Sequence, residues 1–174
     1  MKNKKNKKFK VLVLSDHALS TSGVGTQTRH LIQGLLEKKQ WSFRQFGAAI
    51  KHTNYDTVVV NEDFIIKPID GFGNPELIRL TLATEKPDLL FIFTDPRFFT
   101  WLFEMEDEVH QMCPIIWWHV WDNYPYPDFN DDYYYATDTI NCHSHMTYTM
   151  IKEDEKHAEK TFFIPHAIPT SWFS

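Results

Sequence analysis

Residues 115–135 read IIWWHVWDNYPYPDFNDDYYY, an apolar run that changes abruptly into polar residues and prolines. The run Ile115 to Trp118 is continuously apolar, as expected for a strand that is buried on both faces of a parallel sheet. His119 and Asp122 follow it directly. In open α/β sheets ligands bind beyond the carboxyl ends of the strands, so these two side chains stand where chemistry is expected. The structural alternative is a core histidine and a turn aspartate.

The rest of the chain alternates between strand and helix patterns. The other predicted strands are Lys10 to Leu14, Trp41 to Ile50, Thr57 to Val60, Leu89 to Phe93, Thr137 to Cys142 and Thr161 to Ile164. The predicted helices are one that follows Gly23-Val24-Gly25, then Glu76 to Glu85, a long one from Asp95 to Met112, a short helix or turn from Asp128 to Tyr135, and Met146 to Lys152. This alternation predicts an α/β fold, a Rossmann-like three-layer α/β/α domain with a mostly parallel sheet.

Length and composition indicate one globular domain. The chain has 174 residues, enough to bury a sizeable core, with 43% hydrophobic and 24% charged residues. Its aromatic share of 16% is high, and aromatic side chains often line sugar and nucleotide sites. No apolar run reaches transmembrane length, and two cysteines, Cys113 and Cys142, are the pattern of reduced thiols in a cytoplasmic protein.

The charge is unevenly distributed along the sequence. The first ten residues, MKNKKNKKFK, hold six lysines, so the net charge of −5 leaves −11 on the remainder. An acidic body argues against a general nucleic-acid surface. We expect residues 1–9 to form a basic flexible tail that is dispensable for folding, with a membrane or nucleic-acid contact as the alternative.

A glycine loop follows the first predicted strand. Gly23-Val24-Gly25 precedes Thr26 and an apolar stripe of helical period. Backbone amides at a helix N-terminus favour an anion, and glycine allows a ligand to approach closely. However, Thr28 stands where a dinucleotide fingerprint has its third glycine, and no Gly-Lys-Ser/Thr follows as in a P-loop. A plain helix start is the alternative.

Two further patterns give little support to metal or hydrolase chemistry. His143 and His145 could join His119 and Asp122 around a metal. However, these two histidines stand at a strand-to-helix turn, and the sequence spacing places no third ligand beside them, whereas a metal site needs three or four ligands. No Gly-x-Ser-x-Gly elbow is present. We therefore expect no metal and no cofactor.

The long predicted helix carries an apolar stripe that favours core packing over a cofactor site. The stripe consists of Phe98, Trp101, Leu102, Met105, Val109 and Met112.

Three segments together resemble the amino-terminal domain of the family-four retaining glycosyltransferases, which have the GT-B fold. They are VLVLSDHALSTSGVGTQTRHLIQGL, WHVWDNYPYPDFNDDYYYATDTINCHSHMTYTMI and FFIPHAIPTSWF, and the resemblance covers nearly the whole chain. Such enzymes have two Rossmann-like domains, which hold a nucleotide-sugar donor mainly on the second and the acceptor mainly on the first. The resemblance implies that residues 10–174 are the acceptor-side domain, that a carboxy-terminal donor-binding domain is its partner, and that this chain alone has no transferase activity.

The resemblance also implies roles for single residues. His119 matches the family's catalytic histidine, which faces the donor sugar. Gly23, Val24, Gly25 and Thr26 match the loop near the donor diphosphate, and the stretch Asp122 to Pro127 matches the loop after the histidine. Within that stretch, the expected acceptor-side residues are Asp122, Asn123, Tyr124 and Tyr126. One position departs from the pattern, because Ala167 stands in IPHAI where the family usually has glycine.

We therefore expect a hexosyl-type glycosyltransferase domain that moves a sugar, with retention, from a nucleotide sugar to a carbohydrate or other hydroxyl acceptor. The alternative from another class is a nonenzymatic Rossmann-like binding module. In that reading Tyr124, Tyr126, Phe129 and Tyr133 would form an interaction patch.

Overall fold

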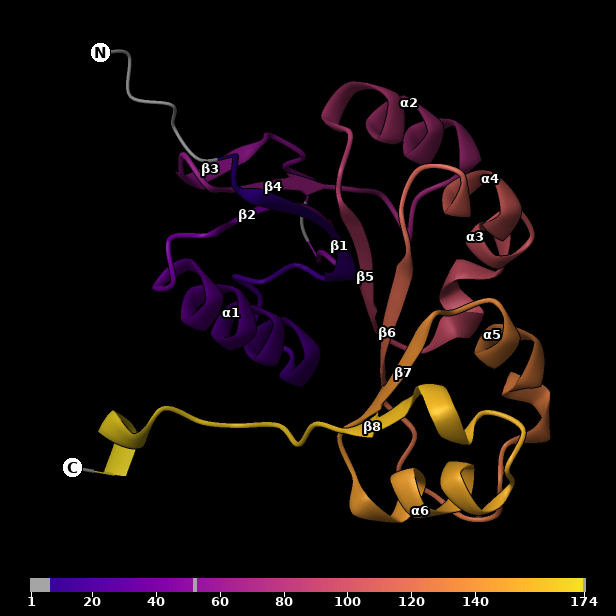
Figure 1. Ribbon diagram of the computed structural model, residues 1–174. Helices are drawn as coiled ribbons and strands as arrows, with labels where there is room; N and C mark the ends of the chain where they lie inside the picture. Colours follow the sequence, from indigo (N-terminus) through magenta and orange to yellow (C-terminus); the bar gives the residue numbers. More distant parts are fainter. Residues whose placement is uncertain (1–6, 52, 174) are drawn as a thin grey trace.

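One eight-stranded sheet runs through the computed structural model, which describes residues 7–51 and 53–173. Its order is β3-β4-β2-β1-β5-β6-β7-β8, and all neighbours are parallel except β3 and β4. The strands are β1 (Phe9–Asp16), β2 (Trp41–Ala48), β3 (Val58–Asn61), β4 (Phe64–Pro68), β5 (Leu89–Phe93), β6 (Ile115–His119), β7 (Thr139–Cys142) and β8 (Thr161–Phe163). With helices on both faces, this is the expected Rossmann-like α/β fold (Figure 1).

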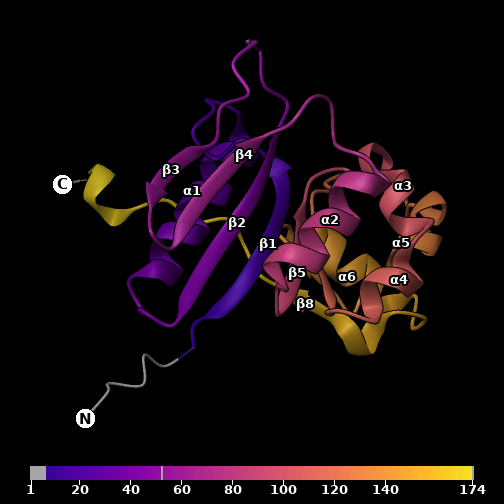
Figure 2. The same cartoon turned by 90° about the horizontal axis from the view of Figure 1, so that it is seen from above.

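The direction of each crossover decides which face its helix covers. The α-helices are α1 (Gly23–Leu36), α2 (Pro75–Glu85), α3 (Thr100–Phe103), α4 (Glu106–His110), α5 (Asp131–Tyr135) and α6 (His145–Glu153). Crossovers between parallel strands are right-handed, so steps from β4 through β5 to β8 put α2 to α6 on one face. The step from β1 to β2 runs the opposite way and puts α1 on the other face (Figure 2).

Two apolar cores lie on the two faces of the sheet. The larger joins the strands to α2–α6 and includes Trp117 and Tyr134, both fully buried. The smaller lies under α1, where Ile32 packs against Val11, Val13 and Phe43. The helix layers are therefore unequal, and this inequality shapes both candidate sites described below.

The long helix predicted from Asp95 to Met112 is wrong. The segment instead forms a 3-10 helix, η1 (Pro96–Phe99), and the two short helices α3 and α4. Phenylalanine, threonine and tryptophan are weak helix formers, so local packing decides the backbone here. Consistent with this, Phe98 and Met112 are 50% and 48% exposed, whereas Leu102 and Val109 are fully buried. Only the middle of the predicted stripe belongs to the core.

Strand β4, which forms a hairpin with β3 at the edge of the sheet, was not predicted. Strand β2 ends at Ala48 and not at Ile50, because Ala49 has a φ of 55° and leaves the extended conformation. At the amino end, Phe9 already belongs to β1, although it was assigned to the tail. Lys7 and Lys8 form ion pairs with Asp88 and Asp63, while the rest of the predicted tail, residues 1–6, lies outside the described residues.

Within the described ranges, no helix combines the length and the apolar character that crossing a lipid bilayer requires.

Candidate functional site

The switch point of the sheet lies between β1 and β5, because the chain leaves β1 in one direction and returns to β5 on its other side. Ligands of open α/β sheets bind at the carboxyl edge beside such a point. The predicted site residues lie along this edge. Gly23 begins α1 after β1, and His119 ends β6, the second strand beyond the switch point.

His119 does not lie on an open rim. Successive side chains of a strand point to opposite faces, so His119 shares the helix-covered face with Trp117, whose ring centroid is 4.4 Å away. Helix α5 closes over this face, and His119 is only 1% exposed. The ring is therefore not open to solvent, and the small hollow beside it is lined by residues of η1 and of the 3-10 helix η2 (Asp128–Asn130).

Two side chains contact Nε2 of the His119 ring. The Tyr134 hydroxyl and the Asn130 side-chain amide lie 3.1 Å and 3.3 Å from it. With the amide nitrogen of Asn130 facing the ring, Nε2 is the acceptor, and this arrangement assigns the proton of the neutral ring to Nδ1. Burial lowers the pKa of His119 to about 3, and the neighbouring His143 acts in the same direction. The ring is therefore an uncharged donor at neutral pH.

A hollow of about 20 Å³ adjoins this ring and is large enough for about one oxygen atom. Three residues that line it contribute buried polar atoms without a hydrogen-bond partner in the described part of the chain. These atoms are Nδ1 of His119, Oδ1 of Asn130 and Nε1 of Trp121. Buried polar groups are nearly always paired, so two donors and one acceptor left without partners point to a hydroxyl group or a water molecule as their partner.

The end of β5 contributes a charged pair to the same hollow. Asp95 caps η1 by accepting from the Arg97 amide at 3.0 Å, and it also accepts from the Arg97 guanidinium. Burial opposes ionisation of Asp95, but the hydrogen bonds from Arg97 outweigh it, so the pKa of this carboxyl is below its ordinary value. The guanidinium in turn lies 5.6 Å from the centre of the Phe129 ring. Asp95 and Arg97 are therefore both charged at neutral pH, and their hydrogen bonds hold them in place in the wall of the hollow.

The glycine loop is built for close packing. A Cβ at position 25 would lie 2.4 Å from Oγ of Ser20 and 2.5 Å from the carbonyl oxygen of His17, so only glycine fits. Ser22 caps α1, with its side chain accepting from the Gly25 amide at 2.9 Å and its carbonyl from the Thr26 amide at 2.9 Å. In the described structure the amides of Gly23 and Val24 have no partner, so these two of the four predicted donor-binding residues can offer an N–H group.

The segment after β8 crosses this edge and links its two ends. Ile164 extends the pairing of β8 by donating to Cys142, and its carbonyl accepts from the Trp118 indole at 3.0 Å. His166 stacks on His143 at 4.6 Å, and the Ala167 amide donates to Gln27 at the start of α1. His119 lines one hollow, and Ser20 to Ser22, directly before the glycine loop, line a separate one.

The expected acceptor-side loop is mostly exposed. Asp122, Asn123 and Tyr124 face solvent, whereas Tyr126 is half-buried and donates to Asp131 at 2.5 Å. The alternative interaction patch is incomplete, because Tyr133 packs against Phe103 at 4.7 Å. Of its four aromatic residues, only Tyr124 and Phe129 are exposed.

The two histidines beside β7 have different contacts. Nδ1 of His143 donates to the carbonyl oxygen of His119 at 2.8 Å, whereas His145 is exposed and contacts Phe163. Among the described residues, no group of three or more histidine, cysteine or acidic side chains is arranged to hold a metal ion.

No family model matches the chain, and a search of curated proteins finds no match.

The prediction from the sequence placed His119 at the end of its strand but did not identify its neighbours, which are Asn130, Tyr134, Asp95 and Arg97. One signal was present, because Asn130 and Tyr134 are four residues apart and face the same side of a helical turn.

Proposed function

We propose that this domain is the acceptor-side half of a retaining glycosyltransferase that uses a nucleotide sugar. One observation carries the proposal, namely the neutral His119 whose buried Nδ1–H has no protein partner and adjoins a hollow at the carboxyl edge. A neutral donor of this kind suits a sugar hydroxyl, because a buried polar site rejects ligands that lack the matching group.

In this proposal each part of the edge has a role. The Nδ1–H of His119 donates to a hydroxyl of the transferred sugar, and Asn130 and Tyr134 act as positioning residues because they hold Nε2. The free amides of Gly23 and Val24, at the positive end of α1, lie near the diphosphate. The exposed loop from Asp122 to Tyr126 faces the acceptor, and the aromatic rings there suit the faces of a sugar.

The same proposal places the protein in the cytoplasm. Cys113 and Cys142 are both free and buried, and burial raises their thiol pKa values to about 11 and about 12. Thiols of this kind stay protonated and unreactive, which is the behaviour expected of structural cysteines.

The experiment is a titration of the chain, joined to the donor-binding domain that the proposal gives it as a partner, with UDP-, GDP- and ADP-sugars, followed by the NMR shifts of single residues. We expect at least one nucleotide sugar to shift the amides of Gly23 and Val24 and the ring of His119. The variant Trp121→Phe keeps the aromatic contact with Phe129 but removes the Nε1–H of the hollow, so it should weaken binding of that ligand.

The control for this titration is His145→Asn, which alters an exposed histidine of the same edge and should leave the affinity unchanged. His119→Asn should abolish the response. Its folding is checked separately by the dispersion of the spectrum. If no nucleotide sugar shifts Gly23, Val24 or His119, the proposal is wrong and the alternative of a nonenzymatic module takes its place.

A further inference from the structure

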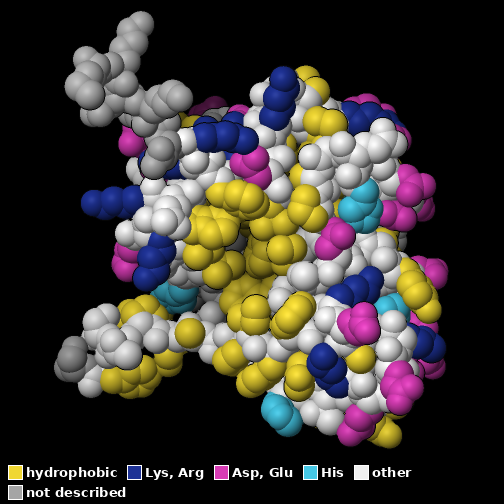
Figure 3. Space-filling view, in the orientation of Figure 1, with side chains coloured by type: hydrophobic (Ala, Val, Ile, Leu, Met, Phe, Trp, Pro, Cys, Tyr) yellow, Lys and Arg dark blue, Asp and Glu magenta, His cyan; other side chains and the backbone are white. Residues whose placement is uncertain are grey.

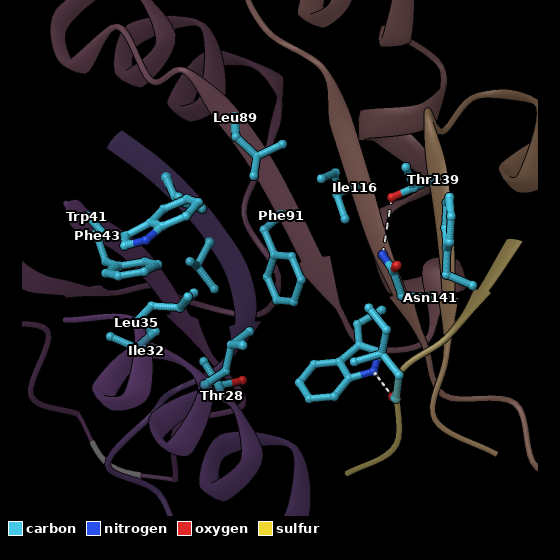
Figure 4. Close-up of a pocket in the computed structure, with 16 residues that line it drawn as sticks. Thr28, Ile32, Leu35, Trp41, Phe43, Leu89, Phe91, Ile116, Thr139 and Asn141 are labelled. Atoms are coloured by element: carbon cyan, nitrogen blue, oxygen red, sulfur yellow. Dashed lines mark hydrogen bonds between the residues drawn. The ribbon is translucent and has the colours of Figure 1, made fainter. Parts of the chain in front are cut away.

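The helices leave part of the sheet uncovered on each face. On the α1 face an apolar groove, lined by side chains such as Ile32, Phe91 and Ile116, lies at the centre of the surface in Figure 3. Figure 4 shows its side chains pointing inward from α1 and from the strands, with Asn141 already donating to Thr139. On the opposite face a second hollow differs from this groove, because it contains charged groups that have no partner.

The second hollow lies at the outer edge of α2, and we call it the charged hollow. Helix α2 connects β4 to β5, and in the described chain no α-helix lies beyond it over β4 and β3. The hollow has a volume of about 210 Å³. Its floor includes Arg44 on β2 and Lys67 on β4, and its wall includes Leu80 and Glu85 on α2. It shares no residue with the hollow beside His119.

The Arg44 guanidinium is held in a fixed orientation in the floor. Its Nη1 donates to the Phe43 carbonyl at 3.0 Å, and its Nε lies 3.2 Å from Oε2 of Glu85, which also accepts from Lys10 at 2.9 Å. Burial opposes ionisation of Glu85, but the hydrogen bond from Lys10 and the charge of Arg44 outweigh it, so the pKa of Glu85 is below its ordinary value. The Arg44 side chain is only 21% exposed, and its Nη2 has no partner among the described residues.

Lys67 is a second cation close to Arg44. The register of β2 and β4 pairs Arg44 with Ile65 and Phe46 with Lys67, so Lys67 is a diagonal neighbour of Arg44 on the same face of the sheet. Within the described part of the chain, Lys67 forms neither an ion pair nor a hydrogen bond. Like charges on neighbouring strands destabilise a sheet. An anion between these two side chains would remove that repulsion.

The charges and donors around the hollow match a phosphate group. Lys10, Arg44 and Lys67 stand against the single carboxylate of Glu85, so these four side chains have a net charge of +2 in a chain of net charge −5. Thr57 adds an exposed hydroxyl group to the lining. A phosphate monoester has a charge close to −2 at neutral pH and three acceptor oxygens. Arg44, Lys67 and Thr57 offer one donor group for each of these oxygens, whereas a carboxylate has only two.

The rest of the hollow limits the size of the organic part. Because a cavity of about 150 Å³ holds one benzene molecule, the hollow has room for roughly eight non-hydrogen atoms, and the phosphate group takes five of them. About three carbon atoms remain. They would meet apolar side chains, namely Phe46 and Ile65 in the floor and Leu80, which is 60% exposed, on the α2 wall.

We propose that the charged hollow binds a small phosphate monoester, with the phosphate oxygens on Arg44, Lys67 and Thr57 and a short carbon chain against Leu80. The site is separate from the carboxyl edge that carries His119, so this proposal does not depend on glycosyl transfer.

The test is calorimetric titration of the 174-residue chain with n-propyl phosphate, inorganic phosphate and butyrate at pH 7.5 and low salt. Each buried methylene tightens binding about fourfold, so n-propyl phosphate should bind at least tenfold more tightly than inorganic phosphate. Butyrate has a carbon chain of similar length but a single charge and two oxygens. It should bind at least tenfold more weakly than n-propyl phosphate because one charged hydrogen bond is lost.

Two variants and one control locate the ligand. Lys67→Gln removes an exposed cation and should weaken both phosphate ligands about tenfold. Leu80→Gln alters the exposed apolar wall and should weaken n-propyl phosphate but not inorganic phosphate. Lys38→Gln is the matched control, because Lys38 is exposed and lies outside the hollow, so this variant should bind as the wild type does.

Several results would overturn the proposal. Weak binding of all three anions with the same Kd, unchanged in Lys67→Gln, would mean an adventitious ion only. A loss of the same size in Lys38→Gln would assign the binding to the net charge of the chain. Butyrate that binds as tightly as n-propyl phosphate, or no binding of any phosphate ligand by the folded chain, would also contradict a phosphate site.

Discussion

At the scale of single residues, His119 shows what a sequence can and cannot predict. The apolar run before it placed it at the end of a central strand, and the structure confirms this position. Its orientation depends on strand alternation and on Asn130 and Tyr134, which come from a short helical segment 11 and 15 residues later. No local pattern encodes that contact, so burial of the ring was not predicted.

The burial of His119 predicts a pH dependence of stability. Its pKa is about 3 in the folded chain and about 6.5 when unfolded, so below pH 6.5 protons bind the unfolded chain first. The stability it contributes is present above pH 6.5 and is lost as the pH falls toward 3, with a slope approaching about 1.4 kcal/mol per pH unit. Urea unfolding between pH 7.5 and 4.5 measures this slope. His119→Asn should have a shallower slope by about one proton, and equal slopes would contradict the buried neutral ring.

The glycine loop offers a matched pair of substitutions. Gly25→Ala would place a methyl group against the His17 carbonyl, which cannot move aside freely, and we expect a loss of about 1–3 kcal/mol in the free energy of unfolding. Gly23→Ala has no neighbour within 4 Å and should change it by less than about 1 kcal/mol. Urea unfolding of both variants provides the comparison. Equal effects would mean that the loop is not closely packed.

At the scale of elements, apolar periodicity and turn residues were sufficient for most of the fold. The strands β1, β5 and β6 and the helices α2 and α6 lie within two residues of their predicted starts, and α1 begins at Gly23 instead of after Gly25. The failures lie where long-range packing outweighs local preference. They are the break between α3 and α4, and the strand β4, which pairs with β2 on one side and with the edge strand β3 across a tight hairpin on the other.

Helix α2 allows a test of one such local signal. Asn74 caps it by accepting from the Leu77 amide at 2.9 Å, with Pro75 at the first helical position. Asn74→Ala should lower the free energy of unfolding by about 1 kcal/mol, whereas Asn74→Asp keeps an acceptor and should stay close to the wild type. Thermal unfolding of the two variants measures the difference. A loss of the same size in Asn74→Asp would show that the cap does not stabilise the helix.

At the scale of the whole molecule, the direction of the crossovers has two consequences. Among the described residues it places five α-helices on one face, where α5 closes over His119, and leaves α1 as the single α-helix on the other, where an apolar groove stays open. The segment after β8 then joins the two halves of the carboxyl edge through Trp118 and Gln27. The candidate sugar site and the groove thus follow from one strand order.

The most direct test of the proposed function is the nitrogen NMR spectrum of the His119 ring at pH 7, recorded for the chain joined to a donor-binding domain, with and without a saturating nucleotide sugar. We expect a neutral ring protonated on Nδ1 in the free chain, and a downfield shift of that proton as it binds a sugar hydroxyl when the ligand is added. A charged ring, a proton on Nε2, or an Nδ1–H signal that no nucleotide sugar changes would contradict the role proposed for His119.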